Sequence, residues 1–258
     1  MTRISDRFAA LREKGGKAFV AFVTAGDPSL DRTVEVALAL DDAGVDVLEL
    51  GVPFSDPLVD GPVIQRASDR ALRGGTRLGE VLQAVARIRA RSDLPLLLFS
   101  YLNPLLRHGL AALSREAAEA GADGVLVTDL PPEEADIWLE HARAAGLDTV
   151  FLAAPTSPDE RLRLVAAASR GFVYAASRTG VTGERDAISE EALPLVRRIK
   201  ALTAEPVVLG FGLSTPDQVG AAAAVADGVV VGSALVRFLE ERPKGDVAGL
   251  VRWLKSAM

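Results

Sequence analysis

The chain has 258 residues, of which 49% are hydrophobic and 25% are charged. This composition is typical of a soluble globular protein and excludes a disordered chain. The sequence contains no cysteine, which excludes a disulfide scaffold, an iron–sulfur cluster, a zinc–cysteine site and a thiol nucleophile. The formal net charge of −6 argues against a general affinity for nucleic acid or for anionic membranes.

The N-terminal segment Met1–Arg7 lacks the apolar stretch that a secretory signal requires. The sequence also has no segment that approaches the ~20 apolar residues of a membrane-spanning helix. We therefore expect a cytoplasmic protein.

Short apolar segments rich in β-branched residues alternate along the chain with amphipathic segments of helical period. The apolar segments carry little polar alternation, which favours a parallel sheet covered by helices. Eight strand–helix units in about 250 residues are typical of a (β/α)8 barrel. We predict this α/β TIM barrel as a single domain over residues 1–258, with an extra N-terminal helix near Ser5–Lys14 across its bottom. The expected strands are Ala18–Thr24, Val45–Leu50, Pro95–Tyr101, Gly124–Asp129, Thr149–Ala153, Phe172–Ser177, Pro206–Gly210 and Gly228–Gly232.

A doubly wound open sheet is the alternative fold. It is disfavoured because the sequence has neither a Gly-x-Gly-x-x-Gly fingerprint nor a division into two halves.

Helix boundaries are marked by two kinds of signal. An N-cap side chain or an early acidic residue accompanies a proline of the first turn at 27–29, 131–134, 157–160 and 214–217. Gly44, Gly121 and Gly146 each stand where a left-handed C-cap is expected, and each is followed two residues later by aspartate. These Gly-x-Asp segments form a weak internal repeat.

Functional residues of such a barrel lie on the loops that follow the strands. Glu49 ends the second expected strand, where alternation from Val47 points it into the barrel mouth. Poor solvation there raises the pKa of a carboxyl group toward the range useful for acid–base catalysis. Asp60 follows on the same loop, so the two carboxylates form a candidate acid–base pair. Alternatively, Asp56 and Asp60 cap the helix near Pro62, and Glu49 pairs with an arginine.

The last three loops are rich in glycine, over 177–183, 210–214 and 232–234. Glycine lets backbone N–H groups approach an anion closely, and barrels of this kind bind phosphate at these loops. We therefore predict a phosphate site, although glycines also terminate helices and form turns. Gly180 and Gly183 could act as hinges of a lid.

The positions of lysine and histidine narrow the chemistry further. Lysine occurs only at 14, 17, 200, 244 and 255, never at the C-terminal end of an expected strand, which argues against a Schiff-base aldolase. His108 and His141 are expected at the surface and, without cysteine, form no familiar zinc site. A proton-transfer reaction on a phosphorylated substrate, without metal or cofactor, remains.

Five motifs together resemble the tryptophan synthase alpha subunit family over essentially the whole chain. They are Phe22–Pro28, Glu49–Pro57 with its continuation Asp60–Gln65, Tyr101–Pro104, Asp129–Pro131 and Ser177–Gly183. The resemblance implies a carbon–carbon lyase of tryptophan biosynthesis. Its reaction would be the retro-aldol cleavage of indole-3-glycerol phosphate to indole and glyceraldehyde 3-phosphate.

The same resemblance implies a role for individual residues. Glu49 would protonate the indole carbon at the breaking bond and help deprotonate the glycerol hydroxyl, while Asp60 would accept the indole N–H proton. Tyr174 would lie near the reacting centre, and Thr182 would meet Asp60 when a lid closes. The implied indole pocket consists of Phe22, Tyr101, Leu126 and Phe211, and the implied phosphate site consists of Gly183, Gly212, Gly232 and Ser233, where Ser233 could instead be a helix N-cap.

The family resemblance also implies a partner, a beta subunit that carries pyridoxal phosphate and receives indole through a tunnel in an α2β2 assembly. The implied contact residues are Pro53, Phe54, Asp56, Asn103 and Pro104. Two other functions stay open from the residues alone. One is another phosphosugar barrel, such as an isomerase or the indole-glycerol-phosphate-forming synthase. The synthase is expected to need a lysine in the barrel mouth, and this sequence places none there. The other is a catalytically silent barrel that binds a ligand and regulates a partner. The presence of Glu49 and Asp60 argues against this second function.

Overall fold

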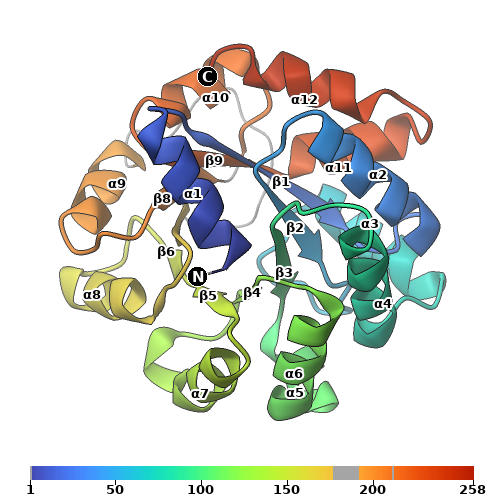
Figure 1. Cartoon of the computed structure of the whole chain (residues 1–258), viewed down its shortest axis with the longest axis horizontal. Helices are drawn as coiled ribbons and strands as arrows, with labels where there is room; N and C mark the ends of the chain where they lie inside the picture. The colour runs from blue at the N-terminus through green and yellow to red at the C-terminus, as the bar shows by residue number, and fades with distance from the viewer. Residues whose placement is uncertain (1, 177–191, 211) are drawn as a thin grey trace.

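The computed structural model describes residues 2–176, 192–210 and 212–258. Its strands are all parallel and form one sheet in the order β5-β4-β3-β2-β1-β9-β8-β7-β6 (Figure 1). The strands are β1 (Ala18–Thr24), β2 (Val47–Gly51), β3 (Leu96–Ser100), β4 (Gly124–Val127), β5 (Asp148–Val150), β6 (Leu152–Ala153), β7 (Val173–Ala176), β8 (Val207–Gly210) and β9 (Gly228–Val231).

The two end strands of this sheet, β5 and β6, are neighbours in the chain and are separated only by Phe151. β5 pairs with β4 and β6 pairs with β7, so together they act as the fifth strand and close the barrel. The strand is interrupted because the N–H of Phe151 donates to Ser169 Oγ (3.3 Å) instead of to the sheet. The predicted (β/α)8 barrel is confirmed, and the open-sheet alternative is wrong.

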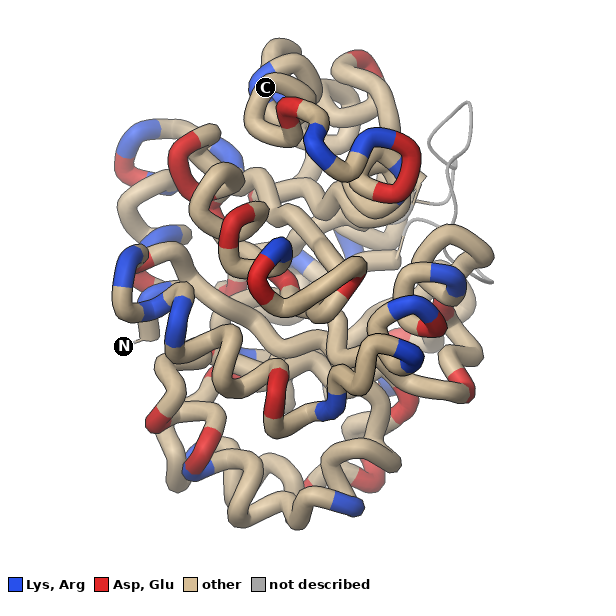
Figure 2. Tube along the Cα trace, turned by 90° about the vertical axis from the view of Figure 1, so that its right-hand side faces the viewer, with Lys and Arg blue, Asp and Glu red and all other residues tan. Residues whose placement is uncertain are grey.

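Helices form the outer layer around the barrel (Figure 1). Lys, Arg, Asp and Glu residues are intermixed along these helices (Figure 2). Within the described part of the chain, no helix is long and apolar enough to cross a membrane. The helices are α1 (Arg3–Glu13), α2 (Leu30–Asp42), α3 (Pro62–Arg73), α4 (Leu78–Arg89), α5 (Leu102–His108), α6 (Leu110–Ala120), α7 (Asp136–Ala144), α8 (Asp159–Ala168), α9 (Ala192–Lys200), α10 (Pro216–Ala223), α11 (Ser233–Glu241) and α12 (Val247–Lys255), with a short 3-10 helix η1 (Pro132–Glu134).

Helix α1 lies across the end of the barrel at which the strands begin (Figure 1), as the sequence predicted. Its Ile4 and Phe8 are buried in the same cluster as the inward-facing residues of the strands. The ring of Phe8 lies 5.7 Å from that of Phe172, which precedes β7. The extra helix therefore seals the bottom of the barrel with apolar side chains.

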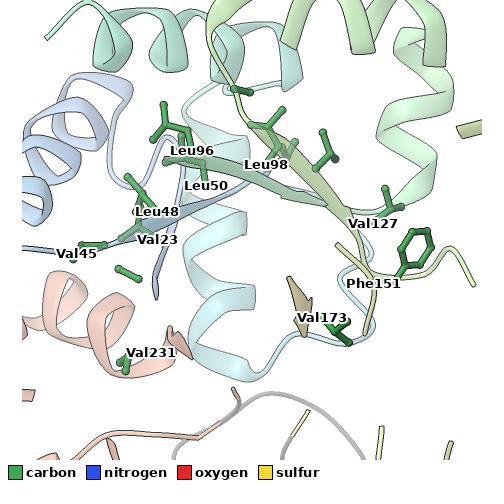
Figure 3. Packing of buried hydrophobic residues seen from close by; sticks show 14 of the residues in the cluster. Val23, Val45, Leu48, Leu50, Leu96, Leu98, Val127, Phe151, Val173 and Val231 are labelled. Atoms are coloured by element: carbon green, nitrogen blue, oxygen red, sulfur yellow. The ribbon is translucent and has the colours of Figure 1, made fainter. Parts of the chain in front are cut away.

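Both faces of each strand are buried, which explains why the strands are apolar throughout. Outward side chains such as Leu48, Leu50 and Leu98 pack between the sheet and the helices (Figure 3). Inward side chains such as Val47 and Leu97 fill the barrel. Glu49 shares the inward parity of Val47 on β2, so the strand itself carries this carboxylate into the barrel.

Several predicted helix boundaries are confirmed. Gly44, Gly121 and Gly146 all have positive φ angles of 80°, 95° and 74°, which suit a glycine at a helix C-terminus. Ser29 caps α2 by accepting from Arg32 N (3.2 Å), and Thr215 caps α10 with Pro216 in the first turn.

Three of the expected proline positions are wrong. Pro28 precedes the N-cap of α2 instead of lying in its first turn, and Pro158 is itself the N-cap of α8. Ser157 does not cap α8 because its Oγ accepts from Ala154 N (3.2 Å) in the preceding turn. Segment 131–134 forms η1, whose i→i+3 bonds end before α7 begins at Asp136.

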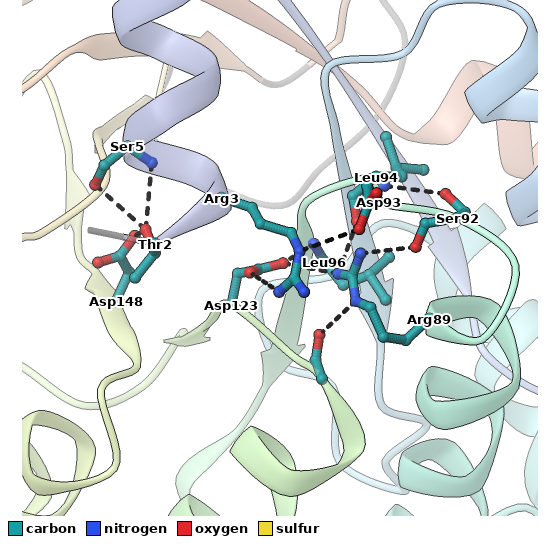
Figure 4. A network of polar contacts seen from close by, with 11 residues as sticks. Thr2, Arg3, Ser5, Arg89, Ser92, Asp93, Leu94, Leu96, Asp123 and Asp148 are labelled. Atoms are coloured by element: carbon teal, nitrogen blue, oxygen red, sulfur yellow. Dashed lines mark hydrogen bonds and ion pairs between the residues drawn. The ribbon is translucent and has the colours of Figure 1, made fainter.

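The Gly-x-Asp repeat has a structural role at the bottom of the barrel. Asp46 and Asp123 each precede a strand and accept from the backbone N–H of the neighbouring strand, at Phe19 and Leu96 (both 2.8 Å). The third aspartate of the repeat, Asp148, accepts from the Thr2 hydroxyl (Figure 4). Each carboxylate thus ties the start of its strand to another segment.

Candidate active site

A small pocket opens at the end of the barrel where the strands finish. This is the end at which the sequence placed the chemistry. Its lining comes from the five strands β1, β2, β3, β7 and β9 and from the segments that follow β2, β8 and β9. The lining residues are Phe22, Glu49, Asp60, Ile64, Phe99, Tyr174, Gly212, Val230, Gly232 and Ser233.

Glu49 lies in the middle of β2, two residues before its end, and is 1% exposed. Its Oε1 has no hydrogen-bond partner among the described residues. Burial away from water disfavours the charged carboxylate and raises the pKa of Glu49 to about 8. The structure records no ion pair of Glu49 in the described ranges, so the arginine-partner alternative has no support there.

Asp60 lies on the loop between β2 and α3 and is 4% exposed. Burial raises its pKa to about 6, against the opposing effect of a hydrogen bond from the Tyr101 hydroxyl. Its Oδ1 has no partner in the described part of the chain. The helix-cap alternative for Asp56 and Asp60 is wrong, because the N-cap of α3 is Gly61 and no side chain caps that helix.

Tyr174 is buried on β7 and lines the same pocket. Burial and the negative charges of Glu49 and Asp60 raise the pKa of its hydroxyl well above the usual range. The structure therefore places this residue beside both carboxylates, where the sequence expected it.

Two glycines that the sequence reasoning missed make room for these side chains. A Cβ atom at Gly210 would overlap the hydroxyl end of Tyr174, and one at Gly51 would overlap the ring of Phe22. Both glycines end their strands. Gly51 belongs to the family motif after the second expected strand and Gly210 to a glycine-rich loop, but neither signal indicated that they make room for aromatic side chains.

Tyr101 was expected to line an indole pocket, but its hydroxyl is engaged with the loop after β2. It accepts from Val59 N (3.2 Å) and donates to Asp60. Its ring lies 5.2 Å from that of Phe54. Tyr101 therefore holds the loop that carries Asp60, and it is not among the residues that line the pocket.

Leu126 is fully buried in the barrel interior, in the cluster that contains Phe22 and Tyr174, and it also does not line the pocket. Phe99 and Val230 line it instead, together with Ile64 of α3. Strand alternation could have indicated Phe99 and Val230, because both share the inward parity of their strands. Ile64 could not have been found in this way, since only the packing of α3 over the mouth brings it there.

The glycine-rich side of the pocket contains Gly212, Gly232 and Ser233. Gly232 is the N-cap of α11, so the interpretation of Ser233 as that N-cap is wrong. The first N–H groups of a helix have no partners within the helix, and they suit an anion. Gly212 has a φ angle of 89°, which glycine adopts without strain. Thr182, Gly183 and Phe211, with the expected lid, lie outside the described residues.

The five expected contact residues for a partner lie together in a second groove. Pro53, Phe54 and Asp56 form one side, and Asn103 and Pro104 contribute the other. The last two lie in the first turn of α5 and not on a loop, because this helix begins directly after β3. Exposed leucines flank the groove on the same two segments, with Leu58 79% and Leu106 54% exposed.

The two histidines lie apart from the pocket and are half-buried. His108 ends α5 and its Nε2 lies 2.7 Å from Glu116 Oε2, while His141 lies within α7. Neither is placed near the two buried carboxylates.

The chain is similar to known proteins over nearly its whole length. A family model described as tryptophan synthase alpha chain matches residues 8–257. The tryptophan synthase alpha chain of Solibacter usitatus is 52% identical over 241 residues, which cover 93% of this chain and 90% of that protein. The tryptophan synthase alpha chain of Geobacter sulfurreducens is 48% identical over 258 residues, which cover 100% of this chain and 98% of that protein. A structure of Mycobacterium tuberculosis tryptophan synthase matches with a TM-score of 0.93 at 41% identity, covering 99% of this chain and 98% of that one. The chain belongs to the tryptophan synthase alpha chain family.

Proposed function

We propose that the chain is the lyase subunit of tryptophan synthase and cleaves indole-3-glycerol phosphate to indole and glyceraldehyde 3-phosphate. The observation that carries this proposal is the pocket itself. It is lined by two buried carboxylates, each with one oxygen that has no hydrogen-bond partner among the described residues, and by the helix N-terminus at Gly232. Such a pocket suits a substrate with a phosphate at one end and a proton-transfer centre at the other.

Glu49 acts as the acid of the reaction. With a pKa of about 8, it is protonated at neutral pH and donates its proton to C3 of the indole ring. The resulting carboxylate then takes the proton of the glycerol hydroxyl next to the breaking bond. The carbonyl of glyceraldehyde 3-phosphate forms as the carbon–carbon bond breaks, and the electron pair of that bond returns to the indole ring.

Asp60 acts as the base toward the indole nitrogen. With a pKa of about 6, it is ionised at neutral pH and accepts the indole N–H proton, which makes C3 more electron-rich. It returns this proton to the nitrogen as the carbon–carbon bond breaks, so that neutral indole is released. The two roles need different pKa values, and the different surroundings of Glu49 and Asp60 supply them. Tyr174 lies beside both groups at the reacting centre.

The phosphate binds at the N-terminus of α11, where Gly232 and Ser233 line the pocket with Gly212. We assign Gly183 to the same site, Phe211 to the indole pocket and Thr182 to a contact with Asp60 on the family resemblance alone. Phe22 lines the pocket and would pack against the indole ring, with Tyr101 and Leu126 as more distant supports.

The partner is a beta subunit that carries pyridoxal phosphate, in an α2β2 assembly that passes indole between subunits. This chain itself uses no cofactor, forms one domain and works in the cytoplasm. The groove of Pro53, Phe54, Asp56, Asn103 and Pro104, with exposed Leu58 and Leu106 beside it, is the proposed contact. Exposed leucines on the segments that line this groove suit burial against another protein.

An assay for indole released from indole-3-glycerol phosphate tests the proposal, with the purified chain alone and with a cognate beta subunit. We expect release in both cases and a higher rate with the partner. Asp60→Asn should lose indole release while still binding glycerol 3-phosphate, which separates chemistry from folding. Absence of indole from the wild-type chain in both conditions would refute the proposed function.

A further inference from the structure

A network of charged side chains outside the pocket joins three segments of the barrel. Arg70 of α3 donates from Nε and Nη2 to the two carboxylate oxygens of Asp27 (2.8 and 2.7 Å), on the loop after β1. The same guanidinium donates from Nη1 to Glu240 Oε1 (2.6 Å), near the end of α11. Glu240 also accepts two bonds from Arg66 (2.9 and 2.7 Å).

The three joined segments are also those that form much of the pocket wall. Phe22 comes from β1, Asp60 and Ile64 from the segment that leads into α3, and Gly232 and Ser233 from the start of α11. The strands β2, β1 and β9 that precede these segments are adjacent in the sheet. The network therefore links the segment that carries the catalytic base to the helix that presents the phosphate site.

Arginine is the one side chain that can make this link. Its planar guanidinium binds one carboxylate with two parallel bonds and still has a donor for a second carboxylate. The Asp27 side chain is only 8% exposed, so it depends on this pairing more than a surface carboxylate would. A lysine could keep the charge but could not hold both carboxylates in fixed directions.

The position of Glu240 on α11 lets its contact with Arg70 affect the phosphate site at the other end of this helix. Glu240 follows Ser233 by seven residues on α11, which places it about 10 Å along the helix at ~1.5 Å per residue. A contact at the far end of a short helix limits how that helix tilts, and thereby where its N-terminus lies. Displacements of about 1 Å at a binding site are sufficient to affect function strongly.

We propose that Arg70 is a positioning residue for the lyase reaction: by holding Asp27 and Glu240 together, it fixes the phosphate-binding end of α11 relative to the Asp60 loop. Arg70 does not touch substrate and acts through these two carboxylates. The inference rests on the proposed function, because it takes the N-terminus of α11 to be the phosphate site.

The test compares Arg70→Gln and Arg70→Lys with Arg66→Gln as the matched control. Arg66 lies one turn earlier on the same helix and shares Glu240, but it makes no bond to Asp27. The readouts are the dissociation constant of glycerol 3-phosphate by calorimetry, kcat and KM for indole release, and the melting temperature.

Arg70→Gln should raise both KM and the glycerol 3-phosphate dissociation constant on the order of tenfold, within the range of couplings between contacting groups. Its kcat should fall less than about threefold because Glu49 is held by β2, outside the network. Arg70→Lys should have a melting temperature near that of the wild type. It should still show most of the loss of glycerol 3-phosphate affinity that is expected for Arg70→Gln. Arg66→Gln should stay within about twofold of wild type, since it leaves the Asp27 link intact.

A double-mutant cycle tests whether Arg70 acts on the phosphate site through Glu240. Glu240→Ala should reproduce most of the affinity loss, and Arg70→Gln with Glu240→Ala should be no worse than either single variant. Additive losses would overturn the proposal, as would wild-type affinity in folded Arg70→Gln. An equal loss in Arg66→Gln would also overturn it. If Arg70→Gln fails to fold, Arg70→Lys and Glu240→Ala still decide the question.

A wild-type chain that releases no indole would refute the proposed function by itself. The glycerol 3-phosphate measurements would still show whether Arg70 positions the α11 end of the pocket. The two failures are therefore distinguishable.

Discussion

At the bottom of the barrel, Asp46 and Asp123 accept hydrogen bonds from backbone N–H groups, and arginines lie beside them (Figure 4 for Asp123). At the top, Glu49 and Asp60 are as deeply buried, yet each keeps an oxygen without a partner among the described residues. The residue type and the burial are similar at the two ends. What differs is whether the chain supplies donors.

This difference separates a stabilising carboxylate from a reactive one. A buried carboxylate that accepts several bonds supports the fold, whereas one left without donors costs free energy of folding and keeps its oxygen available. In barrels of this architecture, activity resides where strands end and stability where they begin. The described residues follow this division.

Asp148 shows that a shifted pKa alone does not mark the active end. Burial raises its pKa to about 6 although it lies at the bottom, where it accepts from the Thr2 hydroxyl. Its position on β5 and its partner, rather than its pKa, assign it to the structural group. The geometry around a carboxylate must therefore be considered together with its titration.

The largest effect that tests the contrast is expected at the top. Glu49→Gln keeps the shape of the side chain but cannot transfer a proton, so indole release should fall about 10²–10⁴-fold. The melting temperature should not fall, because the substitution removes an ionisable group from a buried position. Exposed Glu160→Gln serves as the control, and retention of more than about a tenth of wild-type turnover would refute the role of Glu49.

The opposite outcome is expected at the bottom. Asp123→Ala removes the acceptor for Arg3 (3.1 Å), Arg89 (2.9 Å) and Leu96 N (2.8 Å), so the free energy of unfolding should fall by about 3–5 kcal/mol. The kcat of the folded fraction should change less than about twofold, since the pocket is at the other end. Denaturant unfolding measures the loss. Asp93→Ala is the control, because its side chain is 96% exposed beside the same Arg3 and should cost less than about 1 kcal/mol.

The pH dependence of kcat/KM sharpens the contrast at the top. Activity needs Asp60 ionised, which holds above its pKa of about 6, and Glu49 protonated, which holds below its pKa of about 8. The profile should therefore be bell-shaped, falling about tenfold per pH unit outside this window. The two limbs belong to the coupled pair. A profile that keeps rising above pH 9 would contradict the assignment of Glu49 as the acid.

The smallest effect concerns the Tyr101 hydroxyl, which donates to Asp60 at the top of the barrel. Tyr101→Phe removes the hydroxyl that lowers the pKa of Asp60, so the acidic limb of the profile should move to higher pH. At pH 7 kcat/KM should fall about three- to tenfold and recover as the pH rises toward 8. An unchanged acidic limb, or a loss equal at every pH, would show that Tyr101 serves only to hold the loop. Tyr101 also packs against Phe54, so circular dichroism should verify that the loop variant is folded.

Sequence patterns predicted the barrel because its determinants are local and repeated. Strand–helix alternation, buried strands and the glycines at 44, 121 and 146 are visible without knowledge of distant contacts. The same patterns did not predict the interruption of the fifth strand at Phe151, whose N–H donates to Ser169. They also predicted Ser157 as a cap of α8, whereas its hydroxyl accepts from Ala154 N in the turn before that helix. Those outcomes depend on which donor and acceptor meet, and propensity does not contain that information.

The candidate active site divides in the same way. Strand parity placed Glu49 in the barrel mouth, and the family motif directed attention to Asp60 and Tyr174. Parity could not reveal that Tyr101 would turn its hydroxyl to Asp60 and Val59, or that Ile64 would complete the wall. These placements depend on how α3 and the loop before it pack over the barrel.

The sequence by itself determined the fold, the end of the barrel that carries the candidate site and the carboxylate on β2, because strand alternation and chain direction are local properties. Only the tertiary structure decided which carboxylates receive donors, so that Asp123 is satisfied while Glu49 Oε1 has no partner among the described residues. It alone also joined Asp27, Arg70 and Glu240, three residues spread over most of the chain. Solvation and hydrogen bonding depend on everything that surrounds a group, and those surroundings exist only after segments distant in the sequence have packed together.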